Sequence, residues 1–142
     1  MIVPTTAHAN TFAKSERLVS RKLIDRVFAR GQRSVMAFPL RAVCLSVAPE
    51  EQPEAVSVLV SVSKRHFKHA VDRNRAKRQV REAYRLHKSE LLSALGQGQR
   101  LAVAFLWVAD EPQSSQRVAR SVCTILHRLA RQAASQSTIA EP

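Results

Sequence analysis

Residues 55–63 read AVSVLVSVS, and residues 64–88 continue as KRHFKHAVDRNRAKRQVREAYRLHK. In the first segment valines alternate with serines over most positions, which is the period-two pattern of a strand with one buried face. The second segment begins with a short helix or turn over 64–69 and continues as a helix over about 72–86. A strand of this kind followed by a helix predicts a sheet covered by helices on one side and polar on the other.

The predicted helix 72–86 separates its apolar and basic residues, at about 100° per residue. One sector carries the residues that we expect to be buried: Ala76, Val80, Ala83 and Tyr84. A separate narrow stripe, flanked by two lysines (Lys77 and Lys88), contains Asn74, Arg78, Arg81 and Arg85. Glu82 lies off this stripe and does not offset its positive charges. The arginines of the stripe therefore repel one another unless an anion neutralises them. The stripe therefore predicts a polyanion partner, although a solvated basic face is an alternative.

The segments on either side of this stretch complete one small α+β domain. A helix over 20–30 begins at Ser20 as N-cap and ends before Gly31. Two further strands are predicted over 33–38 and 40–47. Another is predicted over 101–108, where a continuous apolar run is typical of a central strand. A further helical turn is predicted over 89–95, and a last helix from Ser114 or Ser115 to about Arg131. The predicted order is α-β-β-β-α-β-α, with one domain over 14–132 and disordered ends over 1–13 and 133–142.

Composition and charge limit the classes of function. The chain has 142 residues with a net charge of +12. Residues 64–88 alone contain ten Lys and Arg against Asp72 and Glu82, which is +8 of that total. A concentration of positive charge on a small domain predicts binding to a nucleic acid. The alternative is a generally basic surface without a specific partner.

The chain carries no sign of membrane insertion or secretion. Its apolar runs fall well short of the roughly 18–20 residues of a membrane span, and its start, MIVPTTAHAN, is unlike a signal peptide. The two cysteines, Cys44 and Cys123, lie in apolar surroundings without a CxxC motif, as expected in a reducing cytosol. We therefore expect a cytoplasmic protein with no membrane partner.

Catalytic and metal-binding residues are not evident in the sequence. His66 and His69 are spaced for a shared metal, but no third ligand lies nearby, so two solvated histidines are the simpler interpretation. Asp72 and Glu82 are ten residues apart among arginines and do not form a two-metal pair. We expect no catalytic residue and no metal site in the protein.

RNA is a better candidate than DNA. The sequence contains no leucine zipper, helix-turn-helix or zinc-finger pattern. A helix packed on a sheet beside a separate basic helix forms a groove that suits a single strand. Phe28 and Phe38 are available to stack bases there, although Phe28 is equally compatible with a core position on its helix.

Three motifs of the chain occur together: Ser61-Val-Ser-Lys-Arg65 at the end of a predicted strand, RNRxKRxxRE over residues 73–82, and Val27-Phe28-x-x-Gly31 at the end of the first predicted helix. These motifs resemble the strand end, the signature helix and the VFxxG motif of the protein component of bacterial ribonuclease P. The resemblance extends over residues 17–132.

The resemblance implies a fold and a division of labour. The fold would be a two-layer α-β sandwich, like domain 2 of ribosomal protein S5, with a left-handed βαβ crossover that carries the signature helix. The holoenzyme would be an endoribonuclease that removes the 5′ leader of precursor tRNA with Mg²⁺ held mainly by the RNA subunit and the substrate. The protein itself would be non-catalytic, with the RNase P RNA and the precursor leader as its partners, and no DNA.

The resemblance also assigns residues. RNA contact is expected from the signature and its flanks: Lys64, Arg65, Arg73, Asn74, Arg75, Lys77, Arg78 and Arg81, with Arg85 as an extension. The leader cleft is expected to contain Phe28, Ile24 and Phe38. Ile24 stands where the family usually has a second aromatic residue and Leu59 where it usually has glycine. Leader stacking is therefore expected to be weaker, or to come from Phe38 or Phe67 instead.

Three other classes remain open on the sequence alone. A structural ribosomal RNA-binding protein would share the size, the charge and an αβ sandwich. A DNA-binding regulator would use the basic helix in a major groove, but a dimerisation element is missing. A protein-only nuclease would need carboxylates of its own.

Overall fold

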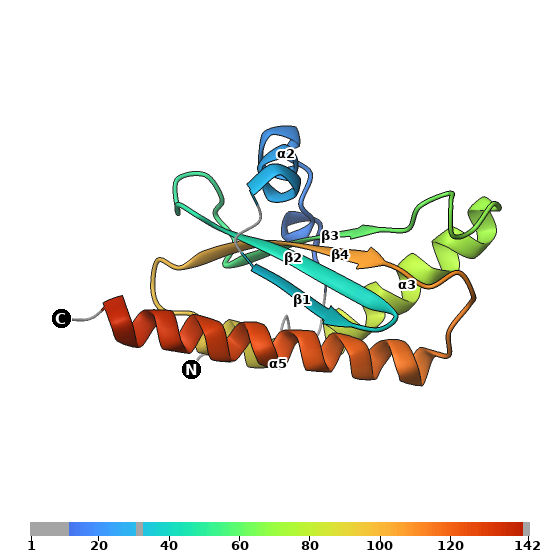
Figure 1. Cartoon of the computed structure of the whole chain (residues 1–142). Helices are drawn as coiled ribbons and strands as arrows, with labels where there is room; N and C mark the ends of the chain where they lie inside the picture. Colours follow the sequence, from blue (N-terminus) through green and yellow to red (C-terminus); the bar gives the residue numbers. More distant parts are fainter. Residues whose placement is uncertain (1–11, 31–32, 141–142) are drawn as a thin grey trace.

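The chain folds as a four-stranded sheet with helices packed on it (Figure 1). The structure, a computed structural model, describes residues 12–30 and 33–140. Its elements, in chain order, are η1 (Lys14–Glu16), α2 (Arg21–Arg30), β1 (Arg33–Ala37), β2 (Leu40–Val47), β3 (Val56–Ser61), α3 (Ala70–His87), α4 (Ser89–Ala94), β4 (Arg100–Trp107) and α5 (Ser115–Ala140). The predicted α+β class is confirmed, and residues 64–69 form a turn rather than a helix. Gly31, the predicted end of the first helix, lies outside the described residues.

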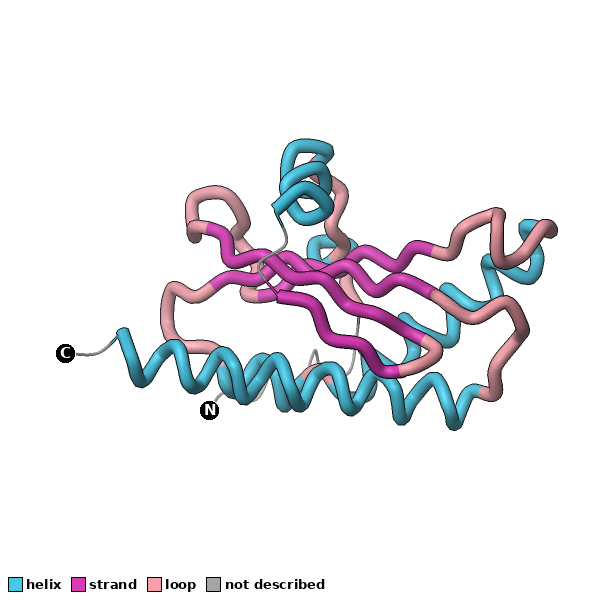
Figure 2. The backbone as a smooth tube through the Cα atoms, viewed as in Figure 1, coloured by secondary structure: helices cyan, strands magenta, loops and turns pink. Residues whose placement is uncertain are grey.

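The strand order in the sheet is β1-β2-β4-β3. β1 and β2 are antiparallel, β2 and β4 are antiparallel, and β3 pairs with β4 in parallel. The predicted central position of the last strand is therefore confirmed. A parallel pair needs a crossover connection, which α3 and α4 supply between β3 and β4 (Figure 2). The left-handedness of this crossover stays a prediction.

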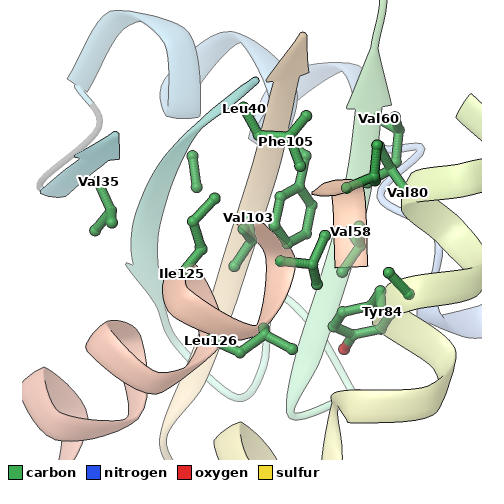
Figure 3. Close-up of a cluster of buried hydrophobic side chains, with 14 of the residues drawn as sticks. Val35, Leu40, Val58, Val60, Val80, Tyr84, Val103, Phe105, Ile125 and Leu126 are labelled. Atoms are coloured by element: carbon green, nitrogen blue, oxygen red, sulfur yellow. The ribbon is translucent and has the colours of Figure 1, made fainter. Parts of the chain in front are cut away.

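The larger core lies between the sheet and the three helices α3, α4 and α5 (Figure 3). Phe105 and Val103 of β4 point into it from the middle of the sheet, and Tyr84 of α3 and Ile125 of α5 meet them from the helices. The four buried residues of α3 are those that the helical periodicity predicts, namely Ala76, Val80, Ala83 and Tyr84. Because these four residues pack into the core, the opposite side of α3 is directed outward.

The opposite face of the sheet is partly covered by α2, which corrects the expectation of a purely polar second face. Leu23 and Val27 of α2 pack with Leu45 of β2 and Ala102 of β4. Ser57 of β3 is accordingly buried, and its hydroxyl donates to Gln52 Oε1 at 2.6 Å. Helices thus lie on both faces, because the apolar residues of β2 and β4 on this side require a cover.

The folded region begins earlier than predicted. Phe12 was expected in a disordered N-terminus, but its ring packs edge-on against Tyr84, with the ring centroids 5.7 Å apart. Leu18 is buried and its N–H donates to the Val58 carbonyl at 2.9 Å. The N-terminal segment therefore runs along the edge of β3, because it supplies apolar cover that β3 and α3 would otherwise lack. Residues 1–11 of the predicted disordered end lie outside the described residues.

The last helix is longer than predicted. It begins at the Ser114 cap, whose hydroxyl accepts from the Arg117 N–H at 3.1 Å, and continues to Ala140. The predicted disordered tail over 133–142 is thus helical as far as Ala140. No glycine or proline interrupts residues 131–140, and Ala133 is buried, so both local propensity and packing favour the continuation. Residues 141–142 lie outside the described residues.

Candidate RNA interface

The outward side of α3 carries a basic surface. Asn74, Arg75 and Arg78 are exposed, and Lys77 and Arg81 are half-buried beside them. We call these five residues the α3 basic face. The side chains of Asn74 and Arg78 form neither a hydrogen bond nor an ion pair with any described residue, so their polar groups are available to a ligand. The buried side of α3 fixes this arrangement, since the two sides share one rigid helix.

Arg81 and Arg17 extend the basic surface onto the N-terminal segment. Partial burial, together with the positive charge of nearby Arg17, lowers the pKa of Arg81. The Arg17 guanidinium lies 5.6 Å from the centre of the Phe12 ring, which holds it beside α3. A nearby anion would relieve the repulsion between the two guanidinium groups. Sequence reasoning missed Arg17, because its proximity to α3 results from long-range packing.

Arg73 differs from the other residues of the signature. Its Nη1 donates to the carbonyl oxygens of Phe67 and Lys68, each at 2.9 Å. These bonds close the 64–69 turn onto the first turn of α3, and the Phe67 ring anchors the same turn against Trp107 at 5.8 Å. Arg73 therefore holds the turn in place, in addition to any contact with RNA.

The turn itself presents Lys64 and Arg65, the two predicted contact residues before α3. Both are exposed, and the Arg65 N–H is satisfied by the Ser63 hydroxyl at 3.0 Å. The turn connects the end of β3 to the start of α3, so these two charges lie at the N-terminal end of the α3 basic face. Lys64 and Arg65 are thus exposed in the turn that leads directly into the helix carrying the other predicted contact residues.

Two basic residues that the helical wheel places in or beside the stripe are already paired. Arg85 forms an ion pair with Glu82, which raises the pKa of Arg85 and lowers that of Glu82. Lys88 is not a flanking surface residue: its side chain is buried and its Nζ lies 2.6 Å from Glu16 Oε1. Both pairs reduce the positive charge that this end of α3 offers to a ligand.

α2 covers only part of the second sheet face and leaves another part of that face open. One row across the strands consists of Met36, Arg41, Leu106 and Ser61. Met36 and Arg41 are exposed and the other two are half-buried, whereas the row beneath α2 is buried. We call this row the open sheet row. Sequence reasoning missed it, although Arg41 is a charged residue on the otherwise apolar side of its strand.

The predicted cleft residues are divided between two places. Phe28 is 51% exposed on α2 and Ile24 is half-buried against the α2 side of the sheet. The remaining candidate, Phe38, lies in the turn between β1 and β2 beside α5, with Arg117 5.1 Å from its ring centre. Phe67, the other predicted source of stacking, is buried in the core. Phe28 and Ile24 therefore stay together on α2, where the leader cleft remains a prediction, and Phe38 lies elsewhere.

Metal-ligating side chains do not gather in the part of the chain that the structure describes. No group of three or more His, Cys, Asp or Glu residues is close enough there to hold an ion. His66 instead has its Nδ1 2.8 Å from an oxygen of Asp110, and His69 is exposed. Across the same described residues, no helix has the length and apolar character to span a membrane.

The chain is similar in sequence to proteins of a known family. The family model of ribonuclease P matches residues 12–130. The ribonuclease P protein component of Porphyromonas gingivalis is 44% identical over 119 residues, which cover 83% of this chain and 85% of that protein. The corresponding protein of Chlorobaculum tepidum is 38% identical over 106 residues, covering 70% and 69% of the two chains.

Solved structures show the same fold. The RNase P protein of Staphylococcus aureus aligns with a TM-score of 0.58 at 23% identity, over 80% of this chain and 94% of that chain. The RNase P protein of Thermotoga maritima aligns with a TM-score of 0.59 at 18% identity, over 80% and 96%. The matched family model covers both the N-terminal segment and the signature helix. The chain therefore belongs to the ribonuclease P protein family.

Proposed function

We propose that this chain, as a protein component of ribonuclease P, uses the α3 basic face and the 64–69 turn to bind the RNase P RNA. The supporting observation is that Asn74 and Arg78 are exposed without partners among the described residues, on a helix whose opposite side is fixed in the core. Guanidinium groups can donate two parallel hydrogen bonds to phosphate oxygens. The positive charges in the turn add to the same surface.

The open sheet row and α2 are proposed to hold the 5′ leader of precursor tRNA. Exposed Phe28 offers a face for base stacking, and Arg41 offers a charge for the backbone. Arg41 is oriented by its Nε, which donates to Ser34 Oγ at 2.9 Å. Apolar surface interleaved with a cation is the combination that single-stranded RNA requires. The leader thus contacts a different face of the protein from the catalytic RNA.

The protein supplies binding and positioning in this proposal, and the RNA subunit carries the chemistry. Mg²⁺ would be held mainly by the RNA subunit and the substrate. The carboxylates on α3 are poorly placed to share an ion, because ten residues of helix separate Asp72 from Glu82 by about 15 Å. Glu82 is also paired with Arg85. Positive charge near the cleaved bond would instead reduce repulsion between the two RNAs.

Precursor-tRNA cleavage by a bacterial RNase P RNA at low Mg²⁺, with and without this protein, tests the proposal. We expect cleavage at the mature 5′ end only when the protein is present. Binding of the RNA without stimulation of cleavage would instead favour a structural ribosomal role. In the same assay, Phe28→Ala is expected to weaken binding of precursor tRNA about tenfold and to leave mature tRNA unaffected, because one stacked base contributes roughly 1–3 kcal/mol.

A further inference from the structure

The turn between β1 and β2 lies beside the first half of α5 at the β1 edge of the sheet (Figure 1). A groove lies there between the turn and the helix. Its volume is about 420 Å³, and it is lined by Ala37, Phe38, Ser114, Arg117, Arg120, Ser121 and Thr124. We call it the α5 groove. α3 packs against α5, where Gln79 Nε2 donates to the Gln113 carbonyl and to Ser115 Oγ, but no residue of α3 lines the groove. It is also on the opposite side of the sheet from α2.

The lining of the α5 groove combines an aromatic ring with cations. Phe38 is 51% exposed although it is a large apolar side chain, and the Arg117 guanidinium lies over its ring at 5.1 Å. Arg120 is exposed one turn further along α5. Among the described residues neither arginine has an ion-pair partner, and no acidic residue lines the groove. Ser121 donates to the Ala37 carbonyl, which ties α5 to β1 at the floor of the groove.

The positive charge continues along α5. Arg117, Arg120 and Arg128 fall within about 80° of one another around the helix, and all three are exposed. The sequence of α5 contains no acidic residue. Arg128 donates to the Met36 carbonyl at 3.4 Å, so it lies on the same β1 side as the groove. A row of like charges without neutralising carboxylates is costly unless an anion binds there.

We infer that the α5 groove binds a nucleotide segment of single-stranded RNA, with a base against Phe38 and adjacent phosphates on Arg117 and Arg120. An aromatic face next to unpaired guanidinium groups is the chemistry that recognises a base together with its phosphodiester. The volume falls in the range of small-ligand sites, roughly 300–1,000 Å³. This inference rests on the proposed function, since the available RNAs are the RNase P RNA and the precursor tRNA.

Binding measurements with the full chain test the inference, using Arg120→Ala, Phe38→Leu and the matched control Arg131→Ala. Arg131 is on the same helix and carries the same charge but lies outside the groove. Circular dichroism confirms that each variant is folded. Affinity is measured for the RNase P RNA alone, and for precursor and mature tRNA bound to the reconstituted holoenzyme, between 50 and 200 mM salt.

We expect Arg120→Ala to weaken binding of one RNA about fivefold and to reduce the log–log salt slope by about 0.7, the value for one single-strand phosphate contact. Phe38→Leu should weaken the same RNA about fivefold without changing the slope. Arg131→Ala should change affinity less than twofold. A loss with the RNase P RNA alone identifies the RNA subunit as the occupant. A loss confined to the holoenzyme identifies the tRNA, and a loss with precursor only identifies its leader.

The inference is wrong if both groove variants bind every RNA within twofold of wild type, or if Arg131→Ala loses as much as Arg120→Ala. Failure of the proposed function has a different signature. In that case wild-type protein itself does not stimulate precursor cleavage at low Mg²⁺, whatever the groove variants do.

Discussion

The Lys88 ammonium lies 2.6 Å from the Glu16 carboxylate and joins the end of α3 to the η1 turn across 72 positions of sequence. Both side chains are shielded from water, with exposed fractions of 3% for Lys88 and 15% for Glu16. The same N-terminal segment carries Phe12 and Arg17 alongside α3. The ion pair therefore fixes the segment that extends the basic surface.

Glu16→Gln is expected to lower the free energy of unfolding by about 3 kcal/mol, because it removes the carboxylate that neutralises a buried ammonium. Urea unfolding measures this change. Glu111→Gln, at an exposed position, is the control and should stay within about 0.5 kcal/mol of wild type. The double variant Glu16→Gln with Lys88→Met should recover part of the loss. Simple additivity of the two changes would contradict a direct interaction.

Arg78→Ala should weaken binding of the RNase P RNA more than Arg85→Ala does. Arg78 has no partner among the described residues, whereas the Arg85 charge is already offset by Glu82. Each lost phosphate contact should reduce the salt slope by about 0.7–0.9, so the Arg78 variant should show the larger reduction. Fluorescence anisotropy over a salt series measures both quantities.

Glu82→Gln is the complementary variant. It removes the carboxylate that holds Arg85 and should therefore strengthen binding of the RNase P RNA. Equal effects of the Arg78 and Arg85 variants, together with no gain from Glu82→Gln, would show that the ion pair does not limit Arg85.

Arg73→Ala should reduce stability as well as RNA affinity. The variant loses two charge-assisted hydrogen bonds to the carbonyls of Phe67 and Lys68, so a loss of about 2 kcal/mol is expected in urea unfolding. Arg75→Ala removes the same charge from an exposed position of the same helix turn and should leave stability within about 0.5 kcal/mol. If the two variants unfold alike, Arg73 does not hold the turn.

Acid should loosen the loop that faces α2. The Ala48 N–H, which donates to Glu51, and the Arg26 guanidinium together lower the pKa of Glu51 below its ordinary value of 4.5. A lowered pKa in the folded state contributes stability above the unfolded-state pKa, and that contribution is lost as the pH falls through the folded-state value. Glu51→Gln should therefore flatten the loss of stability below about pH 4.5. Unfolding midpoints of wild type and variant between pH 7 and 3 measure this, and parallel curves would contradict it.

Local patterns predicted the elements that depend on periodicity. The alternation in 40–47 separates Cys44 and Leu45 onto opposite faces, and the structure buries them in different clusters. The Ser20 cap is also present, its hydroxyl accepting from the Leu23 N–H at 3.3 Å. The buried side of α3 follows directly from the spacing of Ala76 and Val80. Such features depend only on residues that are close together in the sequence, so they can be predicted from a single sequence.

Features that depend on distant pairings were missed. The burial of Lys88 requires Glu16, and the placement of Arg17 beside Arg81 requires the N-terminal segment to return to α3. Phe38 was expected near Phe28, but the turn after β1 directs it to Arg117. A helical wheel gives the direction of a side chain and not its partner. The candidate surface was therefore predictable from the signature. Which of its basic side chains are already paired within the protein was not.

The Arg17 and Leu18 backbone beside Val58 has a further consequence for the behaviour of the free protein. β3 is a terminal strand of the sheet and, without this cover, would present unsatisfied N–H and C=O groups to other chains. Its sequence, VSVLVS, is rich in valine and uncharged, and uncharged segments of high β-propensity favour intermolecular strand addition. By pairing with Val58, the N-terminal segment occupies part of that edge and leaves less of it open to another chain.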